Sequence, residues 1–330
     1  MKNQERWQPP PSLTDYPMAA ESDTEDNRSQ QPRSVMITGA SSGIGRACAL
    51  WLDRAGWQVF ATVRKEADGL RLKSDASPRL RTIQLDVTDS DQISAAARTL
   101  SEQVGREGLH GLVNNAGIAA GGLVEYLDPE ELRRVFETNT IAPLSVSRHL
   151  IHLLRRARGR IVMISSIAGF SSTPLLSPYC ASKFALEALT DGMRLELKPW
   201  GIDVVSIQPG AIKTDIWDKA RSYVEGELRK YPQNAFEKYG PLLTRMAESL
   251  EKPKGVDADE VARTVETALT VARPKARYLV GRDALIRSWI ESLPTSLRDR
   301  LILSRMPKYG TNATNPADKL QEAGQKDANQ

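Results

Sequence analysis

Short apolar runs alternate with amphipathic helical stretches along most of the chain. Between the runs, apolar residues recur every three to four positions, as over 90–104 and 256–272, which is the spacing of a helix with one buried face. Strands that are apolar throughout are buried on both faces of a sheet, and helical connections join them in parallel through right-handed crossovers. We therefore predict an α/β fold: a single doubly wound parallel sheet of about seven strands, flanked by helices on both faces. The predicted strands lie at 34–38, 57–63, 81–85, 109–113, 160–165, 204–207 and 277–280.

The same pattern divides the chain into a folded body and two tails. Residues 1–33 are rich in Pro, Gln, Ser, Asp and Glu, and such a composition buries too little apolar surface to offset the entropy of ordering. We expect a disordered N-terminal tail there and a second disordered tail over 311–330. One domain over 34–283 contains the whole predicted sheet.

Two segments toward the C-terminus depart from the alternation. Residues 212–255 are helical only in patches and carry several aromatic side chains, which suits a lid over an apolar substrate, with an accessory helical pair as the alternative. Residues 284–310 predict a C-terminal helical extension. We expect its apolar stripes to pack on the body of the protein, with contact to a membrane surface as the alternative. The stripe residues are Leu285, Ile286, Trp289, Ile290, Leu293, Leu297, Leu301 and Ile302, and the aromatic residues of the first segment are Trp217, Tyr223, Tyr231, Phe236 and Tyr239.

Composition narrows the class of protein. A chain of 330 residues with 40% hydrophobic content can bury a sizeable core, and 45 basic against 41 acidic residues give a net charge of only +4, so no nucleic-acid partner is expected. The cysteines Cys48 and Cys180 and the few histidines have neither a disulfide pattern nor metal-ligand spacing, so we expect no metal site. No apolar run approaches the ~18 residues of a membrane span, and no signal-peptide layout is present. These features predict a cytoplasmic protein, with peripheral membrane contact as the alternative.

A glycine-rich turn follows the first predicted strand and opens the first helix. Residues 39–45 read GASSGIG, between the apolar run 34–38 and the helical run 46–55. Glycines let the backbone turn tightly and approach a pyrophosphate, whose charge is met by N–H groups at the start of the helix. This order of strand, turn and helix predicts a dinucleotide site in a Rossmann-type domain, with an ordinary glycine-rich turn as the alternative.

Residues at the carboxyl ends of the next two strands bear on the choice of cofactor. Arg64 and Lys65 follow the second strand, where an acidic residue would bind a free ribose 2′-hydroxyl and an Arg suits a 2′-phosphate. This arrangement favours NADP(H), with NAD(H) as the second option; alternatively, both side chains are merely solvated. Asp86, followed by Val87, ends the third strand, where it could bond an adenine amino group or cap a helix.

Tyr179 and Lys183 lie four residues apart in a helix that Ser177 and Pro178 are predicted to open, as N-cap and first helical residue. This spacing puts the phenol and the ammonium on one face of the helix. A neighbouring positive charge favours the ionised phenol, so we expect Lys183 to lower the pKa of Tyr179 from its free value of ~10. The pair could then transfer a proton, although the spacing alone is a weak signal.

With these motifs the chain resembles the classical short-chain dehydrogenases/reductases over about residues 34–280. Residues 38–45 match the family's TGxxxGIG turn, and residues 114–117 match its NNAG motif. The resemblance places the family's catalytic Asn, Ser, Tyr and Lys on Asn139, Ser166, Tyr179 and Lys183. The cofactor-binding residues that it implies, together with those named above, are Gly39, Ser41, Ser42, Gly43, Ile44, Gly45, Arg64, Asp86, Val87, Asn115, Ala116, Gly117, Tyr179, Lys183, Pro209, Gly210, Ile212 and Thr214.

The resemblance implies reversible hydride transfer between NADP(H) and a carbonyl or secondary alcohol carbon. Tyr179 would exchange the proton, while the Ser166 hydroxyl would bond the same substrate oxygen. Lys183 would hold the ribose hydroxyls of the cofactor, and Asn139 would anchor a water that links Lys183 to solvent. The run 179–187 is most similar to the branch of 17β-hydroxysteroid and retinol dehydrogenases, which implies a bulky lipophilic alcohol or ketone of steroid, retinoid or acyl type.

The resemblance also implies a homodimer or homotetramer that pairs the helix around Asn139 and the helix after Tyr179 across a two-fold axis. A function of another class is a non-catalytic NADP(H)-binding sensor that changes a partner interaction. The complete catalytic set argues against this alternative, because a sensor has no need of Ser166.

Overall fold

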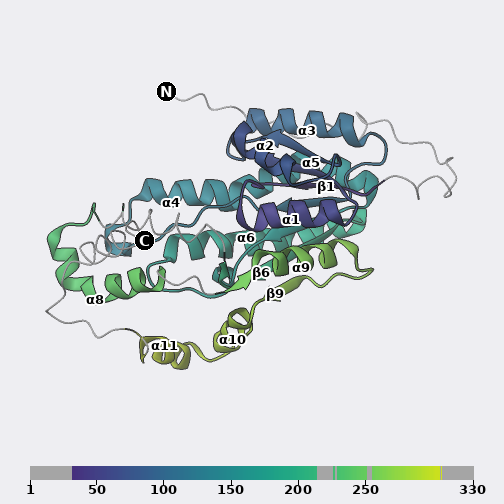
Figure 1. Cartoon of the computed structure of the whole chain (residues 1–330). Helices are drawn as coiled ribbons and strands as arrows, with labels where there is room; N and C mark the ends of the chain where they lie inside the picture. The colour runs from purple at the N-terminus through teal and green to yellow at the C-terminus, as the bar shows by residue number, and fades with distance from the viewer. Residues whose placement is uncertain (1–31, 214–225, 227–228, 251–254, 305, 307–330) are drawn as a thin grey trace.

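The computed structural model describes residues 32–213, 226, 229–250, 255–304 and 306. Their core is a seven-stranded sheet in the order β3-β2-β1-β4-β5-β6-β9, in which every neighbouring pair is parallel (Figure 1). The predicted α/β fold is therefore confirmed. The strands are β1 Ser34–Ile37, β2 Gln58–Val63, β3 Leu80–Gln84, β4 Gly111–Asn114, β5 Arg160–Ile164, β6 Asp203–Pro209 and β9 Arg277–Val280.

Helices cover both faces of the sheet, as predicted. Successive side chains of a strand point to opposite faces, so Val35 and Ile37 join one buried cluster while Met36 joins the other. One cluster is closed by α1, α2 and α9, and the other by α3, α5 and α6. The helices are α1 Gly43–Arg54, α2 Glu66–Ser74, α3 Ser90–Val104, α5 Ala142–Ala157, α6 Ser177–Leu197 and α9 Ala258–Thr270.

The long helical stretch predicted over 130–155 is interrupted by a wider turn. Helix α4 (Pro129–Phe136) passes into a π-helical turn, η4 (Glu137–Ile141), before α5 begins. Asn139 lies in this turn and is completely buried. A π-helical turn adds one residue to a helical turn and is frequent at functional sites. The sequence pattern did not reveal it, because the apolar spacing continues on either side.

The segment 212–255 lies only partly within the described residues. The short strand β7 (Ile212–Lys213), at the start of this segment, pairs in parallel with β8 (Val256–Asp257), which follows its end. Helix α8 (Gln233–Leu250) places Phe236 in a separate apolar cluster together with Leu123 and Leu175. Trp217 and Tyr223 fall outside the described residues, so a lid over the substrate stays a prediction.

The C-terminal extension forms two helices, α10 (Arg282–Glu291) and α11 (Thr295–Ser304), which lie at the edge of the body beyond β9 (Figure 1). Our expectation that their apolar stripes pack on the body was wrong for most of the stripe: Ile290, Leu301 and Ile302 are half-buried, but the other five residues are exposed. The exposed fraction is 52% for Leu285, 59% for Ile286 and 80% for Trp289. The reason is that α10 meets the body through its polar face, as described below.

Nearly all of the two predicted tails, 1–33 and 311–330, falls outside the described residues, so their disorder stays a prediction. In the part of the chain that the structure describes, no helix combines the length and the apolar character that crossing a bilayer requires.

Candidate active site

The glycine-rich turn after β1 has a shape that requires glycine. Gly39 and Gly43 have φ angles of +68° and +56°, in the left-handed region that other residues rarely adopt. A Cβ on Gly45 would lie 2.3 Å from the carbonyl oxygen of Gly39 and 2.4 Å from Nδ2 of Asn115. Helix α1 begins at Gly43, so its first backbone N–H groups lie at this turn and have no carbonyl partner within the helix. The turn is therefore suited to bring backbone donors close to an anion such as pyrophosphate.

Thr38 and Asn115 fix the glycine-rich turn to the end of β4. Nδ2 of Asn115 donates to the carbonyl oxygens of Thr38 and Gly39, at 2.9 and 3.0 Å. In return, Oγ1 of Thr38 accepts from the backbone N–H groups of Asn115 and Ala116, at 2.9 and 3.0 Å. The two motifs that lie far apart in the sequence thus form one rigid unit. Our cofactor-binding predictions omitted Thr38, whose hydroxyl is central to it.

A groove of about 950 Å³ lies beside the turn, between α1 and α2. Ser41 and Ser42 line it together with Arg46, which pairs with Asp75 at 2.5 Å. Ile44 is half-buried and packs on the core instead. None of the four predicted catalytic residues lines this groove, so it lies apart from them.

The carboxyl ends of β2 and β3 carry the remaining predicted cofactor residues. Arg64 is exposed directly after β2, and Val87 is buried after β3. Oδ1 of Asp86 accepts from the backbone N–H and the hydroxyl of Thr88, at 3.0 and 2.8 Å. The helix-cap alternative for Asp86 was wrong, because Asp89 caps α3. A contact of Asp86 with the adenine of a cofactor stays a prediction.

Asn139 connects the loop after β4 to the helix that carries Tyr179. Its Oδ1 accepts from the N–H of Ile118 at 2.8 Å, and its Nδ2 donates to the carbonyl of Ile118 at 2.9 Å and to Oγ of Ser182 at 3.1 Å. Ser182 in turn donates to the carbonyl of Tyr179 at 2.7 Å. Gly117 keeps the loop close, since a Cβ there would lie 3.2 Å from Oδ1 of Asn139. The amide of Asn139 therefore fixes the position of the first turn of α6.

Tyr179 lies in the first turn of α6, near the Ser166 side chain. The helix begins as predicted, but Leu176 occupies the N-cap position that we expected for Ser177. Although the residue as a whole is half-buried, desolvation of its hydroxyl raises the pKa of Tyr179 to about 12, and the nearby Ser166 side chain offsets only part of that rise. The expected lowering of this pKa is therefore wrong for this structure, because desolvation outweighs the effect of nearby polar groups.

Ser166 is held in place at the carboxyl end of β5. Its Oγ accepts from the backbone N–H of Ala168 at 3.1 Å, so the side chain caps the short helical turn η5 (Ile167–Gly169). A capped turn restricts the rotamer of the serine. The hydroxyl that meets Tyr179 is therefore pre-positioned by the local backbone.

Lys183 lies one turn beyond Tyr179 on the same face of α6. Only 5% of its surface is exposed, and Nζ donates to the carbonyl oxygen of Ile164 at 2.9 Å. Nζ lies 5.8 Å from the centroid of the Tyr179 ring. Burial lowers the pKa of Lys183 to about 8, while the carboxylate of Glu187 acts in the opposite direction. The ammonium is therefore the predominant form at neutral pH, close to the phenol.

The structure thus brings the four predicted catalytic side chains to the carboxyl edge of one sheet, next to the glycine-rich turn. Residues 33–225 match the family model described as short chain dehydrogenase. This chain belongs to the short-chain dehydrogenase family. The resemblance inferred from its motifs is confirmed, and the protein is an oxidoreductase for which a nicotinamide cofactor is expected.

Three curated relatives of this short-chain dehydrogenase have informative names. It is 34% identical to the NADPH-dependent 3-dehydrocapnine reductase of Ornithobacterium rhinotracheale, over 84% of this chain and 98% of the relative. It is 36% identical to retinol dehydrogenase 16 of Rattus norvegicus, over 84% and 90%. It is 38% identical to 17-beta-hydroxysteroid dehydrogenase type 6 of the same species, over 81% and 87%. The predicted likeness to the hydroxysteroid and retinol branch is therefore confirmed.

A solved structure supports the fold of the whole domain. The short chain dehydrogenase from Burkholderia cenocepacia, in complex with NADP, is 25% identical and superposes with a TM-score of 0.64 over 82% of this chain and 98% of that one. The seven-stranded sheet of this short-chain dehydrogenase is thus an architecture known from experiment.

Glu187 is a residue of the site that our sequence reasoning missed. It lies four residues after Lys183 and is buried, where its carboxylate accepts from Oγ of Ser206 at 2.5 Å and from Nε of Arg277 at 3.0 Å. A Lys and a Glu four residues apart on a helix interact, so the spacing from Lys183 was the available signal. Glu187 also joins α6 to β6 and β9 of this short-chain dehydrogenase.

The Pro-Gly motif of the short-chain dehydrogenase ends β6. Pro209 is the last residue of the strand, and a Cβ on Gly210 would lie 2.2 Å from both carboxylate oxygens of Asp283. Oδ2 of Asp283 accepts from the N–H of Ala211 at 2.7 Å, and Ile212 is buried directly beyond. Thr214 lies outside the described residues, so its contact with the cofactor stays a prediction.

Proposed function

We propose that this short-chain dehydrogenase uses NADP(H) to transfer hydride to or from a carbonyl or secondary alcohol carbon of a bulky lipophilic substrate, and that residues 34–283 form the catalytic domain. The observation that carries the proposal is the placement of Tyr179 near the Ser166 side chain and one helical turn from the buried Lys183, whose Nζ lies 5.8 Å from the centroid of the Tyr179 ring. The bound cofactor supplies the hydride. The protein must orient the reacting oxygen and move one proton.

Tyr179 is proposed as the group that exchanges the proton. With a pKa of about 12, it is a neutral phenol at neutral pH and can donate its proton to an alkoxide that forms on the substrate. The Ser166 hydroxyl, which lies near Tyr179, is proposed to donate to the same oxygen. In the direction of alcohol oxidation, Tyr179 must act as phenolate, and the ammonium of Lys183 would stabilise that form.

Lys183 and Asn139 have supporting roles in the proposal. The ammonium of Lys183 is available to bind the ribose hydroxyls of the cofactor because it is buried beside the sheet edge and pairs with a carbonyl rather than with a nearby carboxylate. Asn139 holds α6 through Ser182, so it keeps Tyr179 in register with the loop after β4. We also propose the bound water at Asn139 that the family resemblance implies.

The glycine-rich turn fits a dinucleotide, and Arg64 supports NADP(H). The left-handed Gly39 and Gly43 and the close packing of Gly45 leave space that a side chain would fill. The exposed guanidinium of Arg64 at the end of β2 is suited to a 2′-phosphate. We expect Arg64→Ala to weaken NADPH binding about tenfold or more while changing NADH binding little. Titration of both cofactors by nucleotide fluorescence measures this, and equal losses for the two would contradict the assignment.

A lipophilic substrate is supported by the apolar cluster next to the loop that leads from Ser166 to Tyr179, which we call the Ser166 loop. Leu175, in the loop that leads to Tyr179, packs with Leu123 and with Phe236 of α8. Retinol and 17-beta-hydroxysteroid dehydrogenases among the relatives point to the same class of substrate. The test is a screen of steroids, retinoids, acyl ketones and small diketones that follows NADPH oxidation. Turnover confined to small hydrophilic ketones would contradict the proposed class.

A homodimer or homotetramer is proposed from the outer faces of α5 and α6. Leu144 on α5, Ile141 just before it and Phe184 on α6 are exposed by 39%, 48% and 44%. Association would bury these side chains. Light scattering should give a mass of at least two chains, and replacing Leu144 and Phe184 by Ser should reduce that mass.

A further inference from the structure

Helix α10 is amphipathic, yet its apolar face points away from the protein. Leu285 and Trp289 lie four residues apart on one side of α10, with exposed fractions of 52% and 80%, and Ile286 beside them is 59% exposed. Leu293, which is 36% exposed, follows just beyond the end of the helix. Ala284 is the one residue of this helix that is buried. A surface helix normally turns its apolar stripe toward the core. The orientation of α10 is the reverse.

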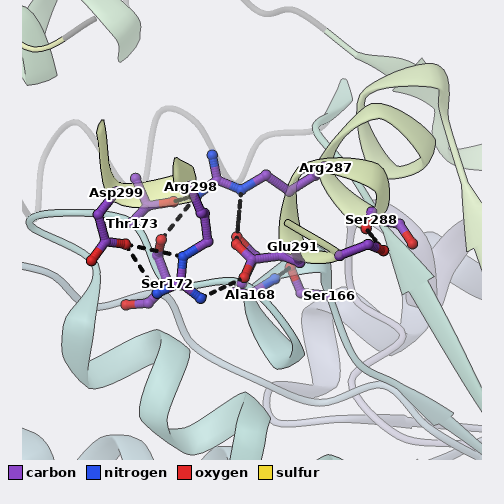
Figure 2. Close-up of polar contacts among 11 residues, drawn as sticks. Ser166, Ala168, Ser172, Thr173, Arg287, Ser288, Glu291, Arg298 and Asp299 are labelled. Carbon is purple, nitrogen blue, oxygen red and sulfur yellow. Dashed lines mark hydrogen bonds and ion pairs between the residues drawn. The ribbon is translucent and has the colours of Figure 1, made fainter. Parts of the chain in front are cut away.

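A polar network holds α10 in this orientation (Figure 2). The guanidinium of Arg287 donates to Oγ of Ser171, and its Nη2 donates to the carbonyl of Ser172 at 2.9 Å and to Oγ1 of Thr173 at 3.1 Å. The Ser171 hydroxyl donates to Oε1 of Glu291 at 2.5 Å. The polar face of α10 is therefore bonded to the loop that follows Ser166. The apolar face cannot turn inward without breaking these bonds.

Helix α11 extends the same exposed surface. Nη1 of Arg298 donates to Oε2 of Glu291 at 3.0 Å, and Arg298 also pairs with Asp299. This ion pair joins the two helices, while Leu297 remains 52% exposed. We call Leu285, Ile286, Trp289, Leu293 and Leu297 the apolar face of α10 and α11.

The charges around the apolar face are unbalanced in favour of arginine. Glu291 and Asp299 are each paired with Arg298, and Asp283 accepts from the backbone of Ala211. Arg282 and Arg300 are exposed and make no ion pair within the described residues. In a dimer formed through this face, the arginines of the two copies would lie close together, with few carboxylates available to pair with them. An anionic surface would match them.

We propose that the apolar face of α10 and α11 binds the surface of an anionic lipid bilayer. Tryptophan and leucine side chains insert at the boundary of headgroups and acyl chains, and flanking arginines bind lipid phosphates. The binding is peripheral, since neither α10 nor α11 has the length to cross a bilayer. The proposal does not rest on the proposed reaction, because lipid binding needs neither cofactor nor substrate.

Co-sedimentation of the full-length protein with vesicles tests the proposal. The vesicles are phosphatidylcholine alone or phosphatidylcholine with about one-third phosphatidylserine. We expect the wild type to sediment with the anionic vesicles and Leu285→Ser/Trp289→Ser to bind at least about tenfold more weakly. The matched control is Leu70→Ser/Leu195→Ser, which removes side chains that are 61% and 66% exposed elsewhere, and it should bind like the wild type. Wild-type protein that stays in the supernatant, or equal binding by all three proteins, would overturn the proposal.

Two further measurements separate lipid binding from self-association. Lipids with brominated acyl chains should quench tryptophan fluorescence in the wild type, and Trp289→Phe should remove most of the quenching. Light scattering without lipid should give the same mass for the wild type and for Leu285→Ser/Trp289→Ser. A lower mass for that variant would assign the face to a second copy of the chain and overturn the proposal.

Discussion

Lys183 carries a buried charge, so replacing it should stabilise the fold even though it removes a group that we propose the reaction needs. Burial lowers the pKa of Lys183 from 10.5 to about 8, and one pKa unit corresponds to about 1.4 kcal/mol. Keeping the ammonium charged at pH 7 therefore destabilises the folded state by about 3 kcal/mol. Lys183→Met also removes the hydrogen bond to Ile164, which is worth about 1 kcal/mol. We expect Lys183→Met to raise the free energy of unfolding at pH 7 by about 2 kcal/mol.

The pH dependence of stability gives this prediction a definite sign. Below pH 8, Lys183 holds its proton in both the folded and the unfolded chain, so its contribution does not change with pH. Between pH 8 and pH 10.5 the unfolded chain keeps the proton and the folded chain has lost it, so the free energy of unfolding rises with pH. From pH 7 to pH 9.5 this rise is about 2 kcal/mol for the wild type, and Lys183→Met lacks it.

Urea denaturation followed by circular dichroism at pH 7, 8, 9 and 9.5 measures both effects. The matched control is Lys73→Met, which removes an exposed lysine on α2 and should follow the wild-type pH dependence. The stability advantage of Lys183→Met should shrink as the pH rises. The reasoning is refuted if Lys183→Met is less stable than the wild type at pH 7, or if the difference between them is the same at every pH.

Two further substitutions test the cofactor turn and the support of Tyr179. Gly45→Ala should destabilise the fold by about 1–3 kcal/mol and weaken NADPH binding, because its Cβ would lie 2.3 Å from the carbonyl oxygen of Gly39. The control Gly192→Ala should instead stabilise α6, because the nearest neighbour of its Cβ would lie at 3.9 Å. Urea denaturation and NADPH titration compare the two variants. Asn139→Ala leaves the N–H and the carbonyl of Ile118 without their partner, so it should lower the free energy of unfolding by about 2 kcal/mol or more. We expect kcat to fall further than NADPH affinity. An unchanged kcat would contradict the role of Asn139 in positioning α6.

The strands and the glycine-rich turn were predictable because local sequence determines them. The central strands, such as β1 and β4, are buried on both faces, so a continuous apolar run such as 34–38 marks them. Gly39 and Gly45 follow the first run directly and open a helix, an order that is typical of a dinucleotide-binding turn. The family motifs then placed Ser166, Tyr179 and Lys183 at one edge of the sheet before any contact was known.

The features that escaped prediction depend on tertiary contacts. The stripe around Trp289 indicates an amphipathic helix, but only the bonds of Arg287 to the Ser166 loop determine which side faces the body. The pKa of Tyr179 depends on how far its hydroxyl is desolvated, which no spacing in the sequence reveals. The buried Asn139 in the π-helical turn likewise bonds the backbone of Ile118, in a loop that local spacing does not connect to it.

The central claim is that the hydroxyl of Tyr179 supplies the proton for hydride transfer. Its most direct test is the single-turnover rate of NADPH oxidation by Tyr179→Phe, with a ketone identified in the substrate screen. We predict a rate at least about 10²-fold below that of the wild type, with NADPH affinity nearly unchanged. Tyr278→Phe, which alters a half-buried tyrosine on β9, is the control and should keep the wild-type rate. A near-normal rate in Tyr179→Phe would contradict the claim.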